Sequence, residues 1–336
     1  MDRYDTCRGM TLIELMVSMV LGLVIVGGAT SAILANRQSY RTNEALSQLQ
    51  ESQRTAFELL ARDVREAGIN GCNSQGKIAN VLQVPGAGAN WWQAWVGTQG
   101  FEGGQAGGAV SIGTDVAARV AGTDSLVVQG VQGVGVSVDT HQPSSANIKL
   151  NATTTAIVDN DILMICDFDH AAIFQVSNYN SNNVTLGHNT GNSMSPGNCS
   201  KGLGYPTVCT TGGNDYAFGR NSQIMRFSVV NWYVGNNGRT EEGGRSLYRV
   251  RMGSGASFVT EEVVAGISNM QLTYREQGRP DFRDSTAVGN WANVNAVRIE
   301  LTSQSADQRV SSDTTVNSGR LQRVFASIVT LRNRVP

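Results

Sequence analysis

One carboxylate lies at the start of an apolar segment that is long enough to cross a membrane. Glu14 is followed, from Leu15 to Ala35, by residues that carry no charge. At 1.5 Å per residue, a helix over that segment crosses the hydrocarbon core of a bilayer. An ionisable side chain there costs roughly 2.5–3.5 kcal/mol on insertion scales, so it needs a partner. The chemistry that Glu14 offers is charge pairing with a cation from an adjacent helix, which offsets desolvation and fixes the register between helices.

A short polar leader precedes the apolar segment and ends at a glycine. In a secretory signal peptide the small-residue cleavage site follows the apolar region, whereas here Gly9 comes before it. Cleavage after Gly9 would keep the apolar segment and leave Met10 with a new α-amino group. Glu14 would then lie about one helical turn from that amine. The alternative is a signal anchor whose Glu14 sits at the level of the headgroups, which leaves the glycine junction unexplained.

The Gly9–Met10 junction, the run Thr11-Leu12-Ile13-Glu14 and the apolar helix resemble the class III signal of type IV pilins and type II secretion pseudopilins. The resemblance implies that a membrane prepilin peptidase cleaves after Gly9 and methylates the new N-terminus at Met10. It also implies that Glu14 meets the amine of a neighbouring subunit. Phenylalanine is commoner than methionine at the position of Met10, which is a departure from the pattern.

The apolar segment continues, without a proline, into an amphipathic second half that ends near Gly68. Apolar residues recur there at three- and four-residue steps on one face, with Gln53 filling a gap. That stripe consists of Leu46, Leu49, Phe57, Leu60 and Val64. We therefore expect four parts: a leader at 1–9, a transmembrane and assembly half of the helix at 10–35, an amphipathic half at 36–68, and an extracytoplasmic β-rich head at 69–336.

After Gly68 the pattern changes to short β-type runs, which predict a mostly antiparallel sheet. With the long helix packed on it, the expected fold is α+β and pilin-like. The candidate strands are 125–129, 161–166, 172–176, 224–234, 246–250, 267–274, 294–301 and 325–331. The turn at 235–238 predicts a hairpin between the fourth and fifth of these runs.

Two stretches interrupt the β pattern. Residues 86–113 are rich in glycine and residues 177–198 are rich in asparagine and serine, so both are expected to be long surface loops. The first contains Trp91, Trp92 and Trp95. An exposed contact surface is one interpretation of these tryptophans, and packing over a core is the one that we favour.

Four cysteines remain once the leader, with Cys7, is removed. An even number of cysteines in an extracytoplasmic segment predicts disulfides. The sequence leaves three connectivities open. We prefer Cys199–Cys209, which closes a short loop, together with Cys72–Cys166, which ties the end of the helix to the sheet. Zinc is the rival interpretation, but no Cys-x-x-Cys spacing favours it.

No metalloprotease, P-loop or nucleophile-elbow motif occurs in the chain, so we assign no catalytic residue, metal ligand or cofactor. The three histidines, His141, His170 and His188, are far apart in the sequence and are expected to be exposed. Asp167 and Asp169 offer oxygen ligands for calcium, although a turn of solvated carboxylates is the interpretation that we favour. A net charge of −1 argues against a general nucleic-acid or anionic-lipid binder.

The C-terminal part resembles the PilW minor-pilin and GspJ pseudopilin group. The residues that carry the resemblance are 262–274, Trp291, 297–301 and, on the PilW side, 323–334. It implies a minor pilin at or near the tip of a type IV pilus that helps to prime assembly and contributes to twitching motility and adhesion. Expected partners are other minor pilins, the major pilin, the prepilin peptidase and, before assembly, the inner membrane.

The expected location follows from the same resemblance. The chain would span the inner membrane of a Gram-negative bacterium once, with its head in the periplasm, and would then enter the extracellular pilus. Two alternatives stay open. One is a GspJ-like minor pseudopilin of a type II secretion system, and the other is a membrane-anchored extracellular binding protein that does not polymerise.

Overall fold

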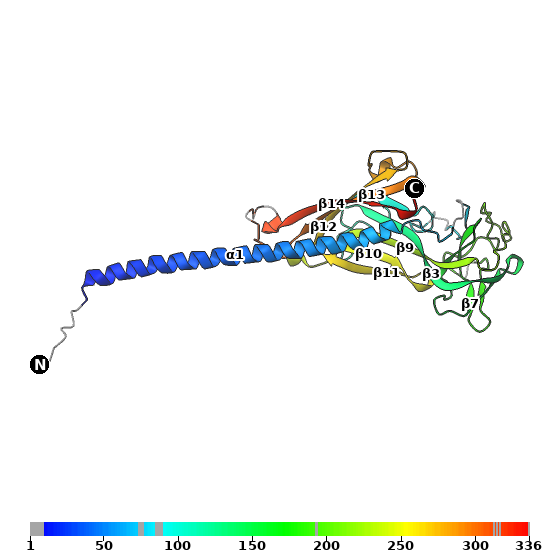
Figure 1. The fold of residues 1–336 in the computed structure, drawn as a ribbon, viewed down its shortest axis with the longest axis horizontal. Helices are drawn as coiled ribbons and strands as arrows, with labels where there is room; N and C mark the ends of the chain where they lie inside the picture. The colour runs from blue at the N-terminus through cyan, green and yellow to red at the C-terminus, as the bar shows by residue number, and fades with distance from the viewer. Residues whose placement is uncertain are drawn as a thin grey trace.

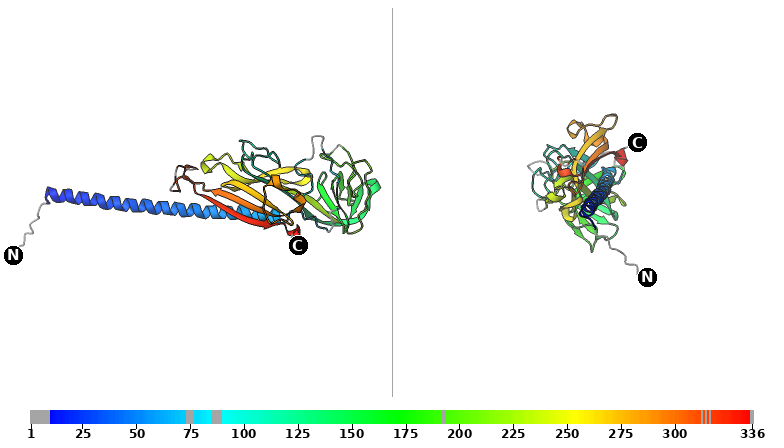
Figure 2. Two further views of the ribbon diagram at one scale, coloured as in Figure 1. Left: turned by 90° about the horizontal axis from the view of Figure 1, so that it is seen from above. Right: turned by 90° about the vertical axis from the view of Figure 1, so that its left-hand side faces the viewer.

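The computed structural model describes residues 10–72, 77–84, 90–191, 194–311, 313, 315 and 317–334. It shows a single long N-terminal helix and a mostly antiparallel β head, which is the α+β, pilin-like architecture expected from the sequence (Figure 1). Helix α1 spans Leu12–Arg65, and its 54 residues correspond to about 80 Å at 1.5 Å per residue. Its first half projects away from the head, and its second half lies along it (Figure 2). The helix is long and apolar enough to cross a membrane.

Two sheets build the head. The larger sheet has 11 strands, of which eight follow the order β1-β6-β5-β9-β3-β4-β8-β7, while β10 and β11 extend from β9 and β2 pairs with β3. The smaller sheet has the order β12-β13-β14 and is antiparallel. The strands are β1 (Ile78–Asn80), β2 (Thr98–Phe101), β3 (Ser125–Gln142), β4 (Asn147–Leu150), β5 (Ile162–Cys166), β6 (Ala171–Gln175), β7 (Asn178–Asn180), β8 (Thr185–Gly187), β9 (Gln223–Asn236), β10 (Arg245–Met252), β11 (Phe258–Ala265), β12 (Ile267–Glu276), β13 (Val294–Gln304) and β14 (Gln322–Thr330).

The candidate strands of the sequence correspond to strands of the structure, and the predicted hairpin is β9–β10, in which Gly235 pairs with Ser246. Three corrections concern the remaining segments. β3 does not end at residue 129 but continues through glycines to Gln142, because it pairs with β9 and β4 and its Val134, Val136 and Val138 alternate as buried residues. The expected loop at 86–113 contains β2, and the one at 177–198 contains the β7–β8 pair.

The second half of α1 packs through a face with smaller residues than the apolar stripe predicted. Its buried residues are Ala45, Leu49, Gln53, Ala56, Leu60, Ala61 and Val64. Leu46 is 39% exposed, whereas alanines that the stripe omitted allow close approach to the sheets. The face contacts β11, β13 and β14. Gln53 is buried because its amide has a partner, the Arg323 carbonyl at 2.8 Å.

The helix ends where the sequence places its stop. Glu66 caps α1, and Gly68 follows in the left-handed region at φ +72°. The Gly68 N–H donates to the Gln129 carbonyl at 2.7 Å, and Asn333 Nδ2 donates to the Gly68 carbonyl at 2.7 Å. These two bonds fasten the end of the helix to both the larger sheet and the C-terminal segment.

The tryptophan-bearing segment packs against the larger sheet, as the favoured interpretation predicted. Trp92 is 4% exposed. Its ring lies 6.3 Å from that of Phe227 and 5.9 Å from that of Phe258, and the Trp95 ring is tilted against that of Phe227 at 5.8 Å. These rings cover a core face and do not form a separate contact surface.

Candidate functional site at the start of the helix

The structure gives Glu14 a partner within its own chain. Thr11 is the N-cap of α1, and Glu14 is the third helical residue. The Glu14 N–H donates to Thr11 Oγ1 at 3.3 Å, while the Thr11 N–H and hydroxyl both donate to Glu14 Oε2 at 3.0 Å. This is a capping box, in which two otherwise unpaired groups at a helix start satisfy each other.

The capping box changes the electrostatic argument for the carboxylate. Glu14 lies in the first turn, where the helix dipole favours negative charge, and its bonds to Thr11 both fall on Oε2. Part of the cost of the carboxylate is therefore offset before any neighbour arrives. The sequence carries a signal for this pairing that we had not interpreted, because Thr11-x-x-Glu14 before an apolar run is the pattern of a capping box.

The residues around Glu14 have no packing partner in the described part of the chain. Met10 is 69% exposed, Leu12 75% and Ile13 73%. None of the most apolar window of α1 is buried against the head. A surface of this kind is stable in lipid or against other helices and not in water. Gly9, the predicted cleavage residue, lies outside the described residues, so the cleavage and methylation assigned to Gly9 and Met10 stay predictions.

A loop of the head reaches down α1 almost to the end of the apolar run. The Gln38 side chain donates to the carbonyls of Arg309 and Val310, both at 3.3 Å, and the Thr42 hydroxyl donates to the Val310 carbonyl at 3.3 Å. The apolar run ends at Ala35. The near edge of the head is therefore set about one helical turn from the expected membrane boundary.

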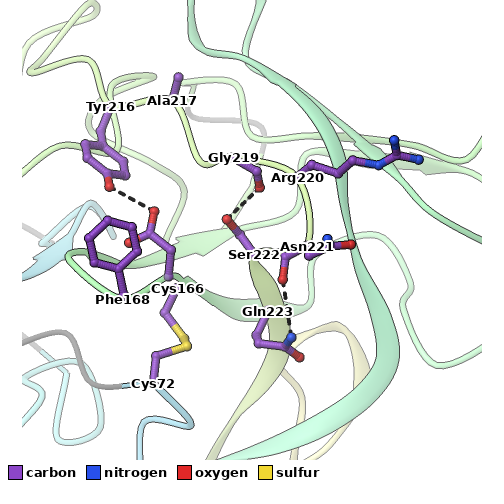
Figure 3. Close-up of a pocket in the computed structure, with 11 residues that line it drawn as sticks. Cys72, Cys166, Phe168, Tyr216, Ala217, Gly219, Arg220, Asn221, Ser222 and Gln223 are labelled. Carbon is purple, nitrogen blue, oxygen red and sulfur yellow. Dashed lines mark hydrogen bonds between the residues drawn. A yellow bond between two sulfur atoms is a disulfide. The ribbon is translucent and has the colours of Figure 1, made fainter.

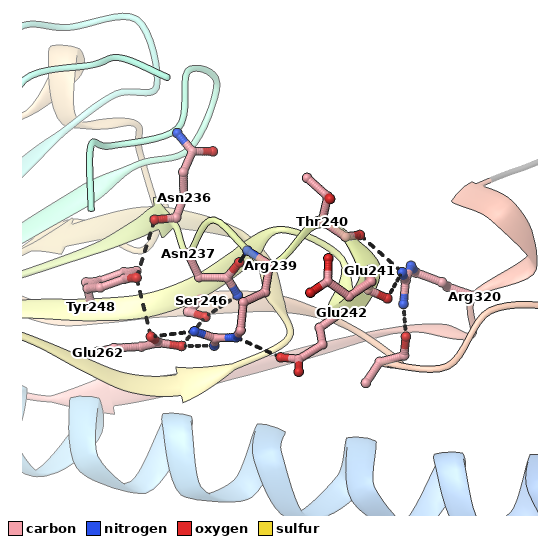
Figure 4. A network of polar contacts seen from close by, with 11 residues as sticks. Asn236, Asn237, Arg239, Thr240, Glu241, Glu242, Ser246, Tyr248, Glu262 and Arg320 are labelled. Atoms are coloured by element: carbon pink, nitrogen blue, oxygen red, sulfur yellow. Dashed lines mark hydrogen bonds and ion pairs between the residues drawn. The ribbon is translucent and has the colours of Figure 1, made fainter. Parts of the chain in front are cut away.

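A polar network holds that loop in place (Figure 4). Arg320 is 5% exposed and donates to the carbonyls of Ser305, Ala306, Thr240 and Glu241. The guanidinium thus links the loop to the turn after β9. These four partners are backbone carbonyls, which is a structural use of arginine.

In the same network, both terminal nitrogens of Arg239 donate hydrogen bonds to the Glu262 carboxylate of β11, and Arg239 Nε donates to Glu242 at 2.7 Å. Ser246 also donates to Glu262, at 2.7 Å. The hydrogen bonds from Arg239 hold the pKa of Glu262 below its usual value. These groups satisfy one another and fix the β9–β10 turn over β11, so they offer no free acid or base.

The two preferred disulfides are present. Cys72–Cys166 joins the segment after α1 to the end of β5, with Cα atoms 6.0 Å apart, and Cys199–Cys209 closes a short loop, with Cα atoms 4.9 Å apart. Both separations are ordinary for disulfides. Cys72–Cys166 also borders a pocket of about 590 Å³ between Phe168 and the segment 216–223 (Figure 3).

The aspartates beside this pocket hydrogen-bond and ion-pair with groups of the protein itself. Asp167 Oδ1 accepts from the backbone N–H groups of Asp169 and His170, and its Oδ2 accepts from the Tyr216 hydroxyl at 2.8 Å. Asp169 pairs with Lys77 at 2.6 Å. In the described residues, no group of three or more His, Cys, Asp or Glu side chains could hold a metal ion. The two aspartates therefore lie in a hydrogen-bonded turn, and their carboxylates are less solvated than the favoured interpretation assumed.

The histidines are placed differently from the prediction. His188 is fully buried and His170 is 7% exposed, while His141 is half-buried. His141 and His188 meet with their Nε2 atoms 3.1 Å apart, and His141 Nδ1 accepts from the Phe218 N–H at 3.1 Å. The prediction that these histidines are exposed was wrong. His141 lies in β3 and His188 follows β8, and because both strands pair with β4, the two rings meet in one core despite their separation in the sequence.

These contacts define the tautomers of the pair. Because His141 Nδ1 accepts, its proton is on Nε2, which donates to His188 Nε2, and the proton of His188 is on Nδ1. Burial lowers the pKa of His141 to about 4 and that of His188 to about 3. Asp215 opposes the shift at His141, whereas Lys201 adds to the shift at His188.

Acidification is expected to destabilise the head through this pair. Each folded-state pKa lies below the usual 6.5, so the stability contribution is complete above about pH 6.5 and is lost as pH falls toward the folded values. At pH 5 the loss is on the order of 2 kcal/mol per histidine. Denaturant unfolding at pH 7 and pH 5 measures this loss, and His188→Leu should reduce the difference between the two pH values by about half, because His141 remains.

The raised pKa of Asp124, about 6, acts in the opposite direction but is common to both proteins, so it cancels in the comparison. An equal pH dependence in the wild-type protein and in His188→Leu would contradict the role of the pair.

Comparisons with known proteins agree with this geometry at both ends of the chain. Residues 231–333 match the family model described as type IV pilus-assembly protein W (PilW), and residues 5–30 match the prokaryotic N-terminal methylation motif. No curated protein and no solved structure matches the chain. The two matches are consistent with a PilW-family pilin, which is a structural and not an enzymatic class. They do not show the expected relation to GspJ pseudopilins.

Proposed function

We propose that this type IV pilus-related pilin is a minor pilin, processed by the prepilin peptidase and incorporated at or near the pilus tip, where it helps to prime assembly. The observation that carries the proposal is α1 itself. One unbroken helix joins a fully exposed apolar half, with Glu14 in its first turn, to a half that is packed into the head. The surface of the first half is stable only against neighbouring helices or lipid. In the described part of the chain, the head buries none of its most apolar window.

The finer steps of the proposal follow from that arrangement. Cleavage after Gly9 exposes the amine of Met10, methylation modifies it, and Glu14 of one subunit pairs with the amine of the next. The leader at 1–9, the assembly half at 10–35, the amphipathic half at 36–68 and the head at 69–336 then have separate roles. The proposed route takes the head from the periplasm, with α1 in the inner membrane, to the outside of the cell in the filament.

The size of the head supports a position at the tip. Both sheets and their long connections lie around and beyond the C-terminal half of α1 (Figure 2). Repeated packing along a filament shaft favours small heads, whereas a terminal position tolerates a large one. Partners in this position are other minor pilins and the major pilin.

The test is mass spectrometry of pili sheared from cells with and without the prepilin peptidase. We expect the chain in sheared pili, at low abundance relative to the major pilin and beginning at a methylated Met10. Without the peptidase it should stay in the membrane fraction and begin at Met1. A chain that is absent from pili and keeps its leader in the presence of the peptidase would refute the proposal.

A further inference from the structure

Strand β14 leaves one edge of the three-stranded sheet open. In the described part of the chain it pairs with β13 and with no other strand. The bonds Ser305 N–H to Leu321 C=O and Leu331 N–H to Asn295 C=O lie at the two ends of this ladder. Since the register between them is unbroken, the odd-numbered residues bond β13, and the even-numbered residues 322–330 direct their N–H and C=O groups outward.

The side chains at this open edge are apolar and uncovered. Val324 is 56% exposed and Ile328 is 54% exposed, and both lie on the face opposite α1. On the other face Phe325 packs edge-on against Phe57, with ring centroids 5.0 Å apart, and Val329 is buried. Proteins protect free edges with charges, proline or bulges. β14 has a regular register, no proline, and Arg323 as its one charged residue.

The direction of β14 limits what pairs with it. Gln53 bonds Arg323 near the start of the strand, and the Gly68 carbonyl bonds Asn333 just after its end. β14 therefore runs parallel to α1, as Figure 1 also shows. An antiparallel pair of two β14 strands would point their α1 helices in opposite directions, and chains that enter one membrane in the same orientation do not allow that.

We propose that the open edge of β14 accepts an extended strand from a neighbouring, different pilin subunit, which lengthens the β12-β13-β14 sheet by β-strand addition. The identity of the occupant rests on the proposed function, because a filament places such subunits beside α1. An extended backbone supplies acceptors and donors at the two-residue spacing that the edge presents, whereas a helix or a lipid does not. Val324 and Ile328 then contact side chains of the added strand.

Photo-cross-linking in piliated cells tests this inference with the full chain. A photoreactive phenylalanine analogue at Gln322 is expected to form an adduct with a second pilin. The same analogue at Thr273, in β12 on the opposite side of the sheet from β14, is expected to form none. Mass spectrometry identifies the partner in the adduct. The content of sheared pili is measured in parallel as a separate readout.

Two variants of the edge give the expected losses. Ala326→Pro removes one outward N–H and keeps the bonds to β13, so the adduct should fall about fivefold, since one lost hydrogen bond is worth on the order of 1 kcal/mol. Ala326→Ser keeps the N–H and should retain the adduct. Val324→Lys combined with Ile328→Lys should lower the adduct by a similar factor while leaving the backbone unchanged. Thermal unfolding of each variant verifies the fold.

The outcomes separate this inference from the proposed function. An adduct with another pilin that both edge variants weaken supports strand addition. A chain that is present in sheared pili without an adduct overturns it and leaves the proposed function standing. An adduct with a second copy of this chain, or one that Ala326→Pro and the lysine pair leave unchanged in folded protein, also overturns it.

Discussion

Glu14→Ala is expected to abolish incorporation into the filament while leaving membrane insertion and cleavage after Gly9 intact. The apolar run from Leu15 to Ala35 is unchanged by the substitution, so insertion has no reason to fail. In the proposed filament, the substitution leaves the neighbouring amine buried without its counter-charge. Removing one partner of a buried ion pair costs about 3–5 kcal/mol, which corresponds to a loss of more than about a hundredfold in incorporation. Quantification of the chain in sheared pili and in membranes measures this.

The capping box supplies the control that separates two roles of Glu14. Glu14→Gln keeps an amide oxygen that can accept from the Thr11 N–H but removes the charge. Thr11→Ala keeps the charge and removes the hydroxyl of the capping box, at a cost of about 1 kcal/mol of helix stability. We expect Glu14→Gln to fail in incorporation and Thr11→Ala to succeed. The reverse result would make Glu14 a helix cap and would contradict charge pairing between subunits.

The two roles of Glu14 are compatible in one filament. The two hydrogen bonds from Thr11 to the carboxylate both fall on Oε2, and a carboxylate has lone pairs for several donors. Thr11 orients the side chain before assembly, and an incoming amine adds a stronger, charge-assisted bond. The capping box would then preorganise the acceptor, which lowers the cost of ordering it on association.

The helix and the later strands were predictable because their physical signals are local. The uninterrupted apolar run, the absence of proline and the glycine at position 68 define α1 to within a few residues. β12 alternates buried and less buried residues along its length, and β5 and β6 are buried throughout. Each pattern comes from a surface with one or two covered faces, and such a surface leaves a periodic record in the sequence.

The elements that were missed depend on contacts between distant segments. The second half of β3 contains Gly130, Gly133 and Gly135, which are unfavourable in strands, and it pairs with β9 and β4. The alternating, buried Val134, Val136 and Val138 were a local signal for it that we did not interpret. His141 in β3 and His188 just after β8 are 47 residues apart and meet because both strands pair with β4. A propensity argument cannot supply such a contact, because tertiary packing overrides local preference.

The candidate site divides in the same way. Glu14 was identified from sequence because a carboxylate beside an uncharged run is costly wherever the run is placed. The contact of residues 309 and 310 with α1 could not be identified from the sequence. The acceptors in this contact are backbone carbonyls, and every residue has one. The open edge of β14 could not be predicted from the sequence either, because an edge strand is recognised only once the pairing of all strands in the sheet is known.

Removal of the Cys72–Cys166 disulfide is expected to cost more stability than removal of Cys199–Cys209. The first closes a sequence separation of 94 residues and the second a separation of 10. Chain entropy of the unfolded state gives about 4.7 kcal/mol for a loop of roughly 100 residues and about 3 kcal/mol or less for one of 15 residues or fewer. The long bridge also ties the segment after α1 to β5, so its loss removes the covalent link between that segment and the larger sheet and leaves the Gly68–Gln129 hydrogen bond.

The two bridges make a matched pair within one chain, since each is removed by two Cys→Ser substitutions. Guanidinium unfolding of the full chain in detergent should show a lower midpoint for Cys72→Ser with Cys166→Ser than for Cys199→Ser with Cys209→Ser, and both below wild type. Because the short bridge closes its loop far from α1, its removal should leave incorporation into pili near normal, whereas the long bridge should be required. Equal midpoints, or a larger loss from the short bridge, would mean that loop entropy is not what the bridges contribute, and that local packing around each cystine governs stability instead.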